Sequence, residues 1–296
     1  MGWFTKKSPA APMTSIQDSV FGMSTLGNGR SVRRDAAQRW GIAGGVIGLV
    51  GALIIFAPAS WLARGLASAT GNYLLLVNTS GSLWNGSGVL VLTGGAGSRE
   101  AASLPGRLHW KLSLKTTGLQ LAARQECCTN GELLIGIKPG LGRMEVSIDS
   151  RADWLARMPA SVLSGLGTPW NTLQLNGSLR LTARDFKLEN VKGRWRQFGE
   201  LQVDLVNLSS RVSTVAPLGS YRVTLKADAN NPVVSTLVLS TQDGALQLNG
   251  VGTIIPGGKS RFNGEAGAAP GREEALNNLL NIIGRRQGAR SVITIG

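Results

Sequence analysis

The chain is poor in the residues that bind metals or act as nucleophiles, with one histidine and two cysteines among its 296 residues. Cys127 and Cys128 are adjacent and His109 is distant from them, so they do not supply the four ligands of a zinc site. In an oxidising compartment the cysteines could form a vicinal disulfide, join another chain or stay reduced. His109 lies in the alternating segment 108–112, which predicts a place on the solvent face of a strand. We expect no metal and no cofactor.

The sequence also lacks a recognisable catalytic motif. Its 17 acidic residues are dispersed, so no pair of carboxylates can be nominated for acid–base chemistry. Residues 86–88, Gly-Ser-Gly, do not complete the elbow of a serine hydrolase. Residues 258–260, Gly-Lys-Ser, resemble the end of a phosphate-binding loop, but Thr253 stands where that motif needs glycine and Pro256 interrupts it. We therefore predict no catalytic residue and no enzyme activity.

Acidic residues are outnumbered by basic ones, 17 against 31, and the net charge is +14. Such an excess often indicates nucleic-acid binding. Here aromatic residues do not cluster among the basic ones, and most of the chain is predicted below to lie outside the cytoplasm. These two features argue against nucleic acid. Membrane lipid with acidic headgroups or an acidic protein partner fits the charge, while most of the charges are expected to form a solvated face.

One long apolar run, residues 40–63, contains no charged side chain. It is long enough for a single helix across about 30 Å of hydrocarbon. Basic residues dominate residues 1–39, so the positive-inside rule leaves this disordered tail in the cytoplasm and carries residues 64–296 across the membrane. A cleaved signal peptide is the alternative, since residues 57–59 loosely resemble a cleavage site. The leader and the apolar run are both too long for one, which favours a retained anchor.

Glycines in this run have the spacing of a helix-packing face. Gly41 and Gly45, and likewise Gly44 and Gly48, are four residues apart and would let another membrane helix approach closely. The partner could be another protein or a second copy of this chain. Because glycine is common in membrane helices in general, the pattern is equally compatible with no packing role.

From residue 73 onward the chain consists of short alternating stretches separated by glycine, asparagine and proline. Apolar and polar residues alternate most clearly over 173–184, which is the period of a half-buried strand. Similar strands are predicted over 89–92, 108–114, 119–123, 132–137, 144–150, 201–205, 221–227 and 246–254. The predicted fold class is therefore mainly β: one N-terminal transmembrane helix followed by a large antiparallel domain over 64–296, with a half-open β groove as one form it could take.

Two segments of that domain have helical patterns. Residues 273–284 open with two acidic residues, place leucine and isoleucine at helical spacing and end in glycine, which predicts a helix. Residues 151–164 place apolar side chains near one side, with Pro159 interrupting, and predict a second short helix.

Several motifs after the apolar run resemble the family of type II secretion system protein N, also called general secretion pathway protein N. The resemblance begins with Gly-Ser-Leu-Trp-Asn-Gly at residues 81–86. Further motifs at matching order and spacing cover residues 168–173, 216–222, 240–246, 262–266 and 279–285.

The resemblance implies an auxiliary component of a bacterial export machine that carries folded periplasmic proteins through an outer-membrane secretin. It implies a single-pass protein of the inner membrane, with a cytoplasmic N-terminus and a periplasmic domain. The implied partners are the L, M and C proteins of the inner-membrane platform, and the secretin. No catalytic residue is implied.

The motif residues could stabilise the fold or contact a partner, and the sequence leaves both readings open. Tryptophan beside glycine or proline is expected to anchor a sheet edge or cover the end of a core, and Pro217–Ser220 is expected to form a turn. The residues concerned are Gly81, Leu83, Trp84, Gly86, Pro169, Trp170, Pro217, Leu218, Gly219 and Tyr221.

A second function class is lipid handling. Amphipathic strands with one apolar face could curl into a half-open groove that holds acyl chains, a layout similar to that of AsmA-like bridge proteins. The two readings differ in whether the helix over 273–284 covers the apolar strand face or leaves it open. The side chains of that face are predicted to be Leu173, Leu175, Leu179, Leu181, Leu246, Leu248 and Ile254.

Overall fold

The computed structural model describes residues 28–296 with the exception of 152, 229, 256 and 257. The chain divides into two compact units, Met1–Phe56 and Ala57–Gly296. Residues 1–27 of the predicted basic tail over 1–39 lie outside the described residues. From Asn28 onward that segment is helical, which corrects the expectation of disorder for its last part.

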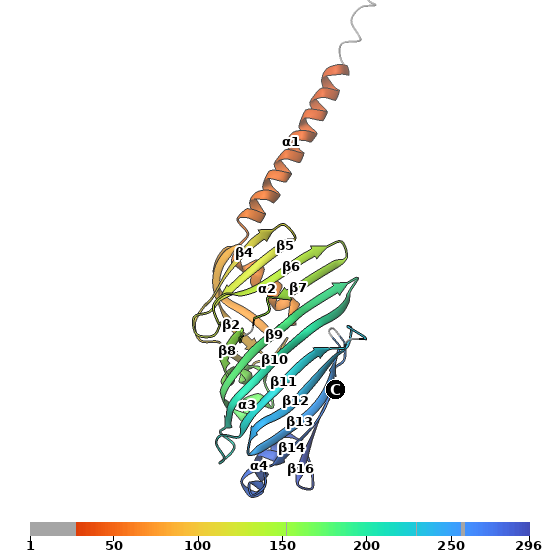
Figure 1. Ribbon diagram of the computed structural model, residues 1–296. Helices are drawn as coiled ribbons and strands as arrows, with labels where there is room; N and C mark the ends of the chain where they lie inside the picture. The colour runs from red at the N-terminus through yellow and green to blue at the C-terminus, as the bar shows by residue number, and fades with distance from the viewer. Residues whose placement is uncertain (1–27, 152, 229, 256–257) are drawn as a thin grey trace, which may run out of the picture. The chain divides into compact units, whose positions relative to one another are not determined.

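The first unit contains helix α1 (Asn28–Ile55) (Figure 1). Its stretch Gln38–Ile55 is long and apolar enough to cross a membrane. The helix predicted over 40–63 needs correction at both ends, because α1 begins at Asn28 and stops at Ile55. Pro58 accounts for the stop, since proline lacks a backbone donor and disfavours helical backbone in the residue before it.

Residues 59–63 belong instead to a second helix, α2 (Ala59–Ala69), in the other unit. Ala59, Leu62 and Leu66 turn one side of α2 toward Leu76 and Trp110 of the sheet. The apolar character that extends the run past Ile55 therefore serves packing on the sheet.

The described residues of the second unit form one open, 16-stranded sheet (Figure 1). Neighbours along the sheet are antiparallel and follow chain order for most of its width, and β1 and β15 form the two edges. Short hairpin connections account for this order, because they return each strand beside the one before it. The strands are β1 (Leu74–Gly81), β2 (Asn85–Thr93), β3 (Ala101–Ser103), β4 (Leu108–Lys115), β5 (Gly118–Arg124), β6 (Leu133–Gly140), β7 (Arg143–Ile148), β8 (Ala156–Pro159), β9 (Leu175–Val191), β10 (Arg194–Ser210), β11 (Gly219–Ala227), β12 (Ser235–Gly244), β13 (Leu246–Ile254), β14 (Arg261–Ala268), β15 (Arg285–Gln287) and β16 (Arg290–Ile295).

Strand register separates an apolar face of this sheet from a polar face. Leu181 of β9 lies opposite Val203 of β10, and Val203 lies opposite Val223 of β11. The residues beside them, including Asp204 and Arg222, also lie opposite each other but point to the other side. Apolar residues that alternate with polar ones along each strand therefore also lie opposite apolar residues of the neighbouring strands. The predicted fold class, mainly β and antiparallel, is confirmed.

Helices cover the apolar face near the C-terminal end of the sheet. The 3₁₀ helix η1 (Ala160–Leu166), α3 (Trp170–Leu173) and α4 (Glu273–Ile283) share one buried cluster with β9, β10, β11, β13 and β14. Its members include Leu175, Leu246, Leu276 and Leu280. Burial of this kind stabilises by about 25 cal/mol per Å² of apolar surface removed from water.

One predicted helix of this unit is confirmed and the other is wrong. The helix over 273–284 is α4, with Leu276, Leu279 and Leu280 buried. Within that segment, residues 156–159 instead form β8, which pairs with β9, and residues 160–164 belong to η1. Pro159 ends β8, and strand pairing by the residues before it outweighs the weak helical periodicity that predicted a helix.

We expect Leu280→Ala to lower the free energy of unfolding by about 2–5 kcal/mol, because it leaves a cavity in the cluster under α4. Denaturant titration of the detergent-solubilised full chain, followed by circular dichroism, measures the change. The control is Asn278→Ala on the exposed side of α4, which should cost about 0.5 kcal/mol or less. Equal losses in the two variants would contradict the packing of α4 on the sheet.

Candidate functional site

The chemistry-bearing side chains do not gather into a reaction centre. Among the residues that the structure describes, no group of three or more His, Cys, Asp or Glu could hold a metal ion. His109 is exposed on β4, as predicted. Cys127 and Cys128 are joined in a vicinal disulfide, so one of the three states left open by the sequence is the one observed.

The first family-like motif, residues 81–86, joins the start of the second unit to the sheet. The backbone N–H of Leu83 donates to the carbonyl oxygen of Ala57 at 2.8 Å, and the indole N–H of Trp110 donates to the carbonyl of Leu83 at 3.2 Å. The carbonyl of Trp84 accepts from the N–H of Leu112 at 2.7 Å. The motif therefore ties Ala57 to β4.

Glycine is required at two positions of this motif. A Cβ on Gly86 would lie 2.5 Å from the Trp110 ring, so a side chain there would displace the tryptophan. Gly81 has φ +88, and a Cβ on it would lie 2.5 Å from the carbonyl oxygen of Asn85. The predicted anchoring role fits these contacts, and partner contact by the same residues stays a prediction.

Motif residues 217–221 connect β10 to β13 through hydrogen bonds. The N–H of Leu218 donates to the Leu208 carbonyl at 2.7 Å, and the Leu218 carbonyl accepts from the N–H of Leu246 at 2.9 Å. The buried hydroxyl of Tyr221 donates to the Leu246 carbonyl at 2.9 Å. Burial raises the pKa of that hydroxyl above its ordinary value, so Tyr221 remains a donor.

Gly219 and Pro217 of the same motif differ in exposure: Gly219 is buried and Pro217 is exposed. Gly219 has φ +154 and is packed so closely that a Cβ would lie 2.4 Å from the Asp243 carbonyl. Pro217 is exposed, so it remains the member of this motif that is open to a partner.

The motif at Pro169 and Trp170 forms the start of α3. Trp170 is partly buried against the main cluster, and Pro169 is the exposed residue before the helix. The tryptophan thus packs against that cluster, and partner contact by Trp170 stays a prediction.

The glycines of α1 lie on the surface of their helix. A Cβ on Gly41, Gly44, Gly45 or Gly48 would meet nothing within 4 Å. Their role in packing against a second helix stays a prediction.

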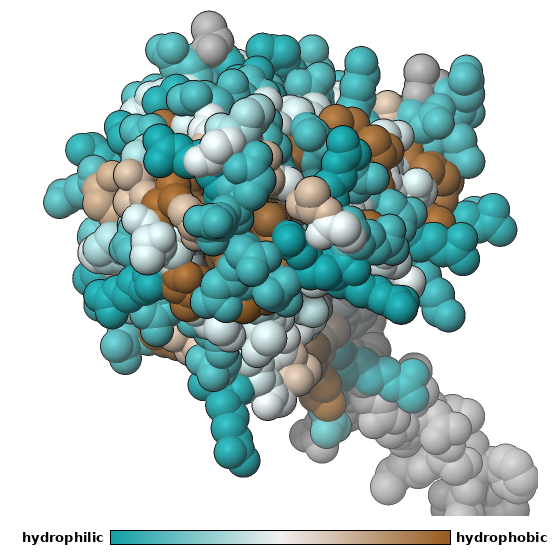
Figure 2. Space-filling model, turned by 90° about the horizontal axis from the view of Figure 1, so that it is seen from below, coloured by the Kyte–Doolittle hydropathy of each residue, from teal (hydrophilic) through white to brown (hydrophobic). Residues whose placement is uncertain are grey.

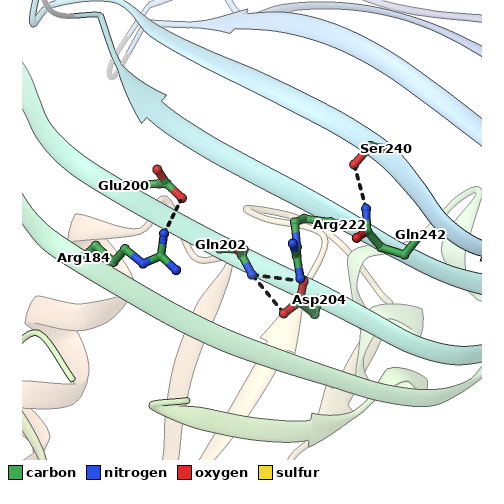
Figure 3. Close-up of polar contacts among 7 residues, drawn as sticks. All are labelled: Arg184, Glu200, Gln202, Asp204, Arg222, Ser240 and Gln242. Atoms are coloured by element: carbon green, nitrogen blue, oxygen red, sulfur yellow. Dashed lines mark hydrogen bonds and ion pairs between the residues drawn. The ribbon is translucent and has the colours of Figure 1, made fainter. Parts of the chain in front are cut away.

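Side chains on the polar face form cross-strand pairs over β9 to β11, and further contacts run along β10 and β12 (Figure 3). Arg222 Nε lies 2.7 Å from Asp204 Oδ1, and Gln202 Nε2 donates to the same carboxylate at 3.0 and 3.1 Å. Arg184 and Glu200 lie 3.9 Å apart. The alternation over 173–184, 201–205 and 221–227 predicts polar positions at Arg184, Gln202, Asp204 and Arg222. It does not predict their partners, because pairing depends on register. We name this surface the polar ladder.

Half-buried apolar side chains occupy the middle of the other face. Leu181, Leu201, Val203, Val223 and Leu239 fall in this class, whereas Leu175, Leu179 and Leu246 nearer α4 are buried. Helix α4 and its neighbours therefore cover part of the predicted strand face and leave Leu181, Leu248 and Ile254 half-buried. Seen from below, the molecule has a mostly hydrophilic surface with hydrophobic patches between the hydrophilic side chains (Figure 2).

These features define a class of protein with an apolar helix of membrane-spanning length and an open antiparallel sheet. The family model described as type II secretion system (T2SS), protein N, matches residues 72–293, and the chain belongs to this family. It is therefore a protein of the type II secretion machinery, which implies interaction with other proteins of that system. Comparison with curated proteins and with solved structures gave no match.

We expect Tyr221→Phe to lower the free energy of unfolding by about 1–3 kcal/mol, because it removes a donor from the Leu246 carbonyl within the core. Tyr73→Phe, at the other, exposed tyrosine, should change it by about 0.5 kcal/mol or less. Denaturant titration of both variants measures the difference. If both variants matched the wild type, the Tyr221 hydroxyl would have no structural role.

Proposed function

We propose that this chain is a non-catalytic assembly protein of the type II secretion machinery in the bacterial inner membrane. In this proposal α1 crosses the membrane with its N-terminus in the cytoplasm, and the sheet unit lies in the periplasm. The observation that carries the proposal is that one chain of this family contains both an apolar helix long enough to cross a membrane and an open sheet.

The distribution of charge supports the orientation. Residues 1–39 contain more basic than acidic side chains, and the apolar run follows them directly. Retention of such a basic segment in the cytoplasm sends the following residues outward. A periplasmic location also suits the vicinal disulfide, since disulfides form and persist in that compartment.

Two surfaces suit contacts with the platform proteins L, M and C or with the secretin. The first is the glycine face of α1, where a second membrane helix could approach the backbone closely. The second is the outer edge of β16: β14 pairs with residues 290–295, whereas β15 pairs only with residues 290–292. Among the described residues, Ile293–Ile295 thus have one edge open to a partner strand.

Photo-crosslinking in cells tests this proposal. A photoreactive amino acid at Ala52 or Thr294 of the full chain should give covalent adducts with inner-membrane platform proteins, because Ala52 is exposed on the glycine face of α1 and Thr294 is exposed on β16. Cells lacking the platform proteins supply the control. Adducts that persist unchanged in those cells, or no platform adduct from either position, would contradict the assembly role.

The half-buried apolar rows favour a second candidate, binding of acyl chains as in an AsmA-like lipid-binding or lipid-transfer protein. The side chains in the middle of the apolar face, such as Leu181, Val203 and Val223, are apolar and only half-buried. An acyl chain laid along Val203 and Val223 would remove apolar surface from water at about 25 cal/mol per Å².

Lipid mass spectrometry of the purified full chain distinguishes the two candidates. If the apolar face binds acyl chains, Val223→Asp should reduce the amount of retained lipid, because it places a charge in the apolar row. Thr224→Asp is the matched control, since Thr224 is the next residue and points to the polar face. If the wild type and both variants retained equal amounts of lipid, the lipid would not be bound at Val223. If the wild type retained no more lipid than a blank preparation, lipid binding would be contradicted.

A further inference from the structure

Three hairpins have their tips at the same end of the strands of the sheet unit. Their tips join β4 to β5, β6 to β7 and β9 to β10, and the strands follow one another in the sheet order. Arg143 beside the second tip lies opposite Val191 beside the third, so these tips are neighbours. We define residues 114–117, 138–144 and 191–194 as the hairpin rim.

Apolar side chains on this rim are exposed to an unusual degree. Leu141 is fully exposed at the second tip, and Leu114 at the first tip is 75% exposed. Met144 beside Leu141 is exposed as well. The neighbouring tips bring these exposed side chains to one end of the sheet, and apolar side chains gathered on one surface and rimmed by polar residues are typical of interaction sites.

Basic residues flank these leucines. Lys115, Lys138, Arg143, Lys192 and Arg194 are all exposed on the rim. The acidic side chains nearby are already engaged: Glu145 pairs with Lys138 at 3.0 Å, and Glu189 pairs with Arg143 at 2.9 Å. A hydrogen bond from Lys138 lowers the pKa of Glu145, so this carboxyl remains ionised and paired at neutral pH. The rim as a whole therefore has an excess of positive charge.

The rim lies at the end of the sheet where the anchor is attached. Ala57, the first residue of the sheet unit, accepts a hydrogen bond from Leu83 in the β1–β2 turn. That turn leads into Asn85, which lies opposite Lys111 of β4. Leu114 follows three residues further along β4, at about 3.3 Å per residue. Figure 1 shows the β4–β5 and β6–β7 tips at this same end of the sheet.

The short connection between α1 and Ala57 limits how far the sheet unit can lie from the end of α1. Only Phe56 separates Ile55, the last residue of α1, from Ala57. Two residues span about 7 Å at most. If α1 crosses the bilayer, the end of the sheet that carries Ala57 must therefore start close to the membrane surface.

We propose that the hairpin rim docks onto the surface of an anionic lipid bilayer, with Leu114 and Leu141 entering the headgroup region and the basic side chains facing lipid phosphates. This combination is the one by which apolar side chains beside lysine and arginine bind anionic membranes. The proposal rests on the proposed membrane anchoring by α1. Docking would hold the sheet unit in one orientation above the membrane.

Depth-dependent fluorescence quenching tests it on the full chain in vesicles of phosphatidylcholine and phosphatidylglycerol. A single added cysteine at residue 114, 141, 47 or 278 is labelled with an environment-sensitive fluorophore, because the native cysteines are joined in a disulfide. The labelled variants are Leu114→Cys, Leu141→Cys, Ile47→Cys in α1, and Asn278→Cys on α4. Lipids with a spin label near the headgroup serve as quencher.

The proposal expects headgroup quenching to remove about half of the emission at positions 114 and 141, and little at 278. Replacing phosphatidylglycerol by phosphatidylcholine should weaken that quenching, since the basic side chains lose their counterpart. Quenching at 47 by spin labels deep in the bilayer reports the anchor separately. Deep quenching at 47 without quenching at 114 and 141 overturns the docking proposal alone, including the case in which a protein covers the rim. Loss of quenching at 47 overturns the anchor and the docking proposal together.

Discussion

Cross-strand pairing of apolar side chains on one face of the sheet is the interaction on which the rest of the second unit depends. Leu181, Val203 and Val223 lie side by side across β9, β10 and β11, and similar rows run beside them. Because the sheet does not close on itself, this face needs other cover. Helices α2, α3, α4 and η1 supply it in part, through buried residues such as Ala59 and Leu280 that they place against the strands. The polar ladder on the opposite face needs no such cover, since its charges are paired and solvated.

The attachment of this sheet to the preceding chain is equally constrained. Gly86 lies against the Trp110 ring, and the indole N–H of that tryptophan donates to the Leu83 carbonyl. Leu83 in turn holds Ala57, the residue at which the sheet unit begins. The first residue of the sheet unit is therefore hydrogen-bonded to the β1–β2 turn. This arrangement supports our inference that one end of the sheet faces the membrane.

The place of the chain in type II secretion follows from its family, and its fold suits an assembly role. Most motif residues that mark the family are used inside the chain: Leu218 and Tyr221 bond to Leu208 and Leu246, and Trp170 packs at the start of α3. Surfaces left for partners are the glycine face of α1, the outer edge of β16 and the hairpin rim. The half-buried apolar rows are a further available surface, for which acyl chains are the candidate ligand.

The sequence by itself determined the strand-rich architecture, the apolar helix, α4 and the family, because each depends on periodicity or on motifs within a short segment. Alternation over 173–184 predicted the first half of β9, except that Leu173 ends α3, and the amphipathic pattern over 273–284 predicted α4. The end of α1 before Pro58 is a local effect of proline that the long uncharged run obscured. The strand at residues 156–159 was missed because it depends on pairing with β9. Only the tertiary structure decided which polar residues pair, as in Asp204 with Arg222, and which leucines are buried. Register sets both outcomes, and register arises from contacts between strands far apart in the chain.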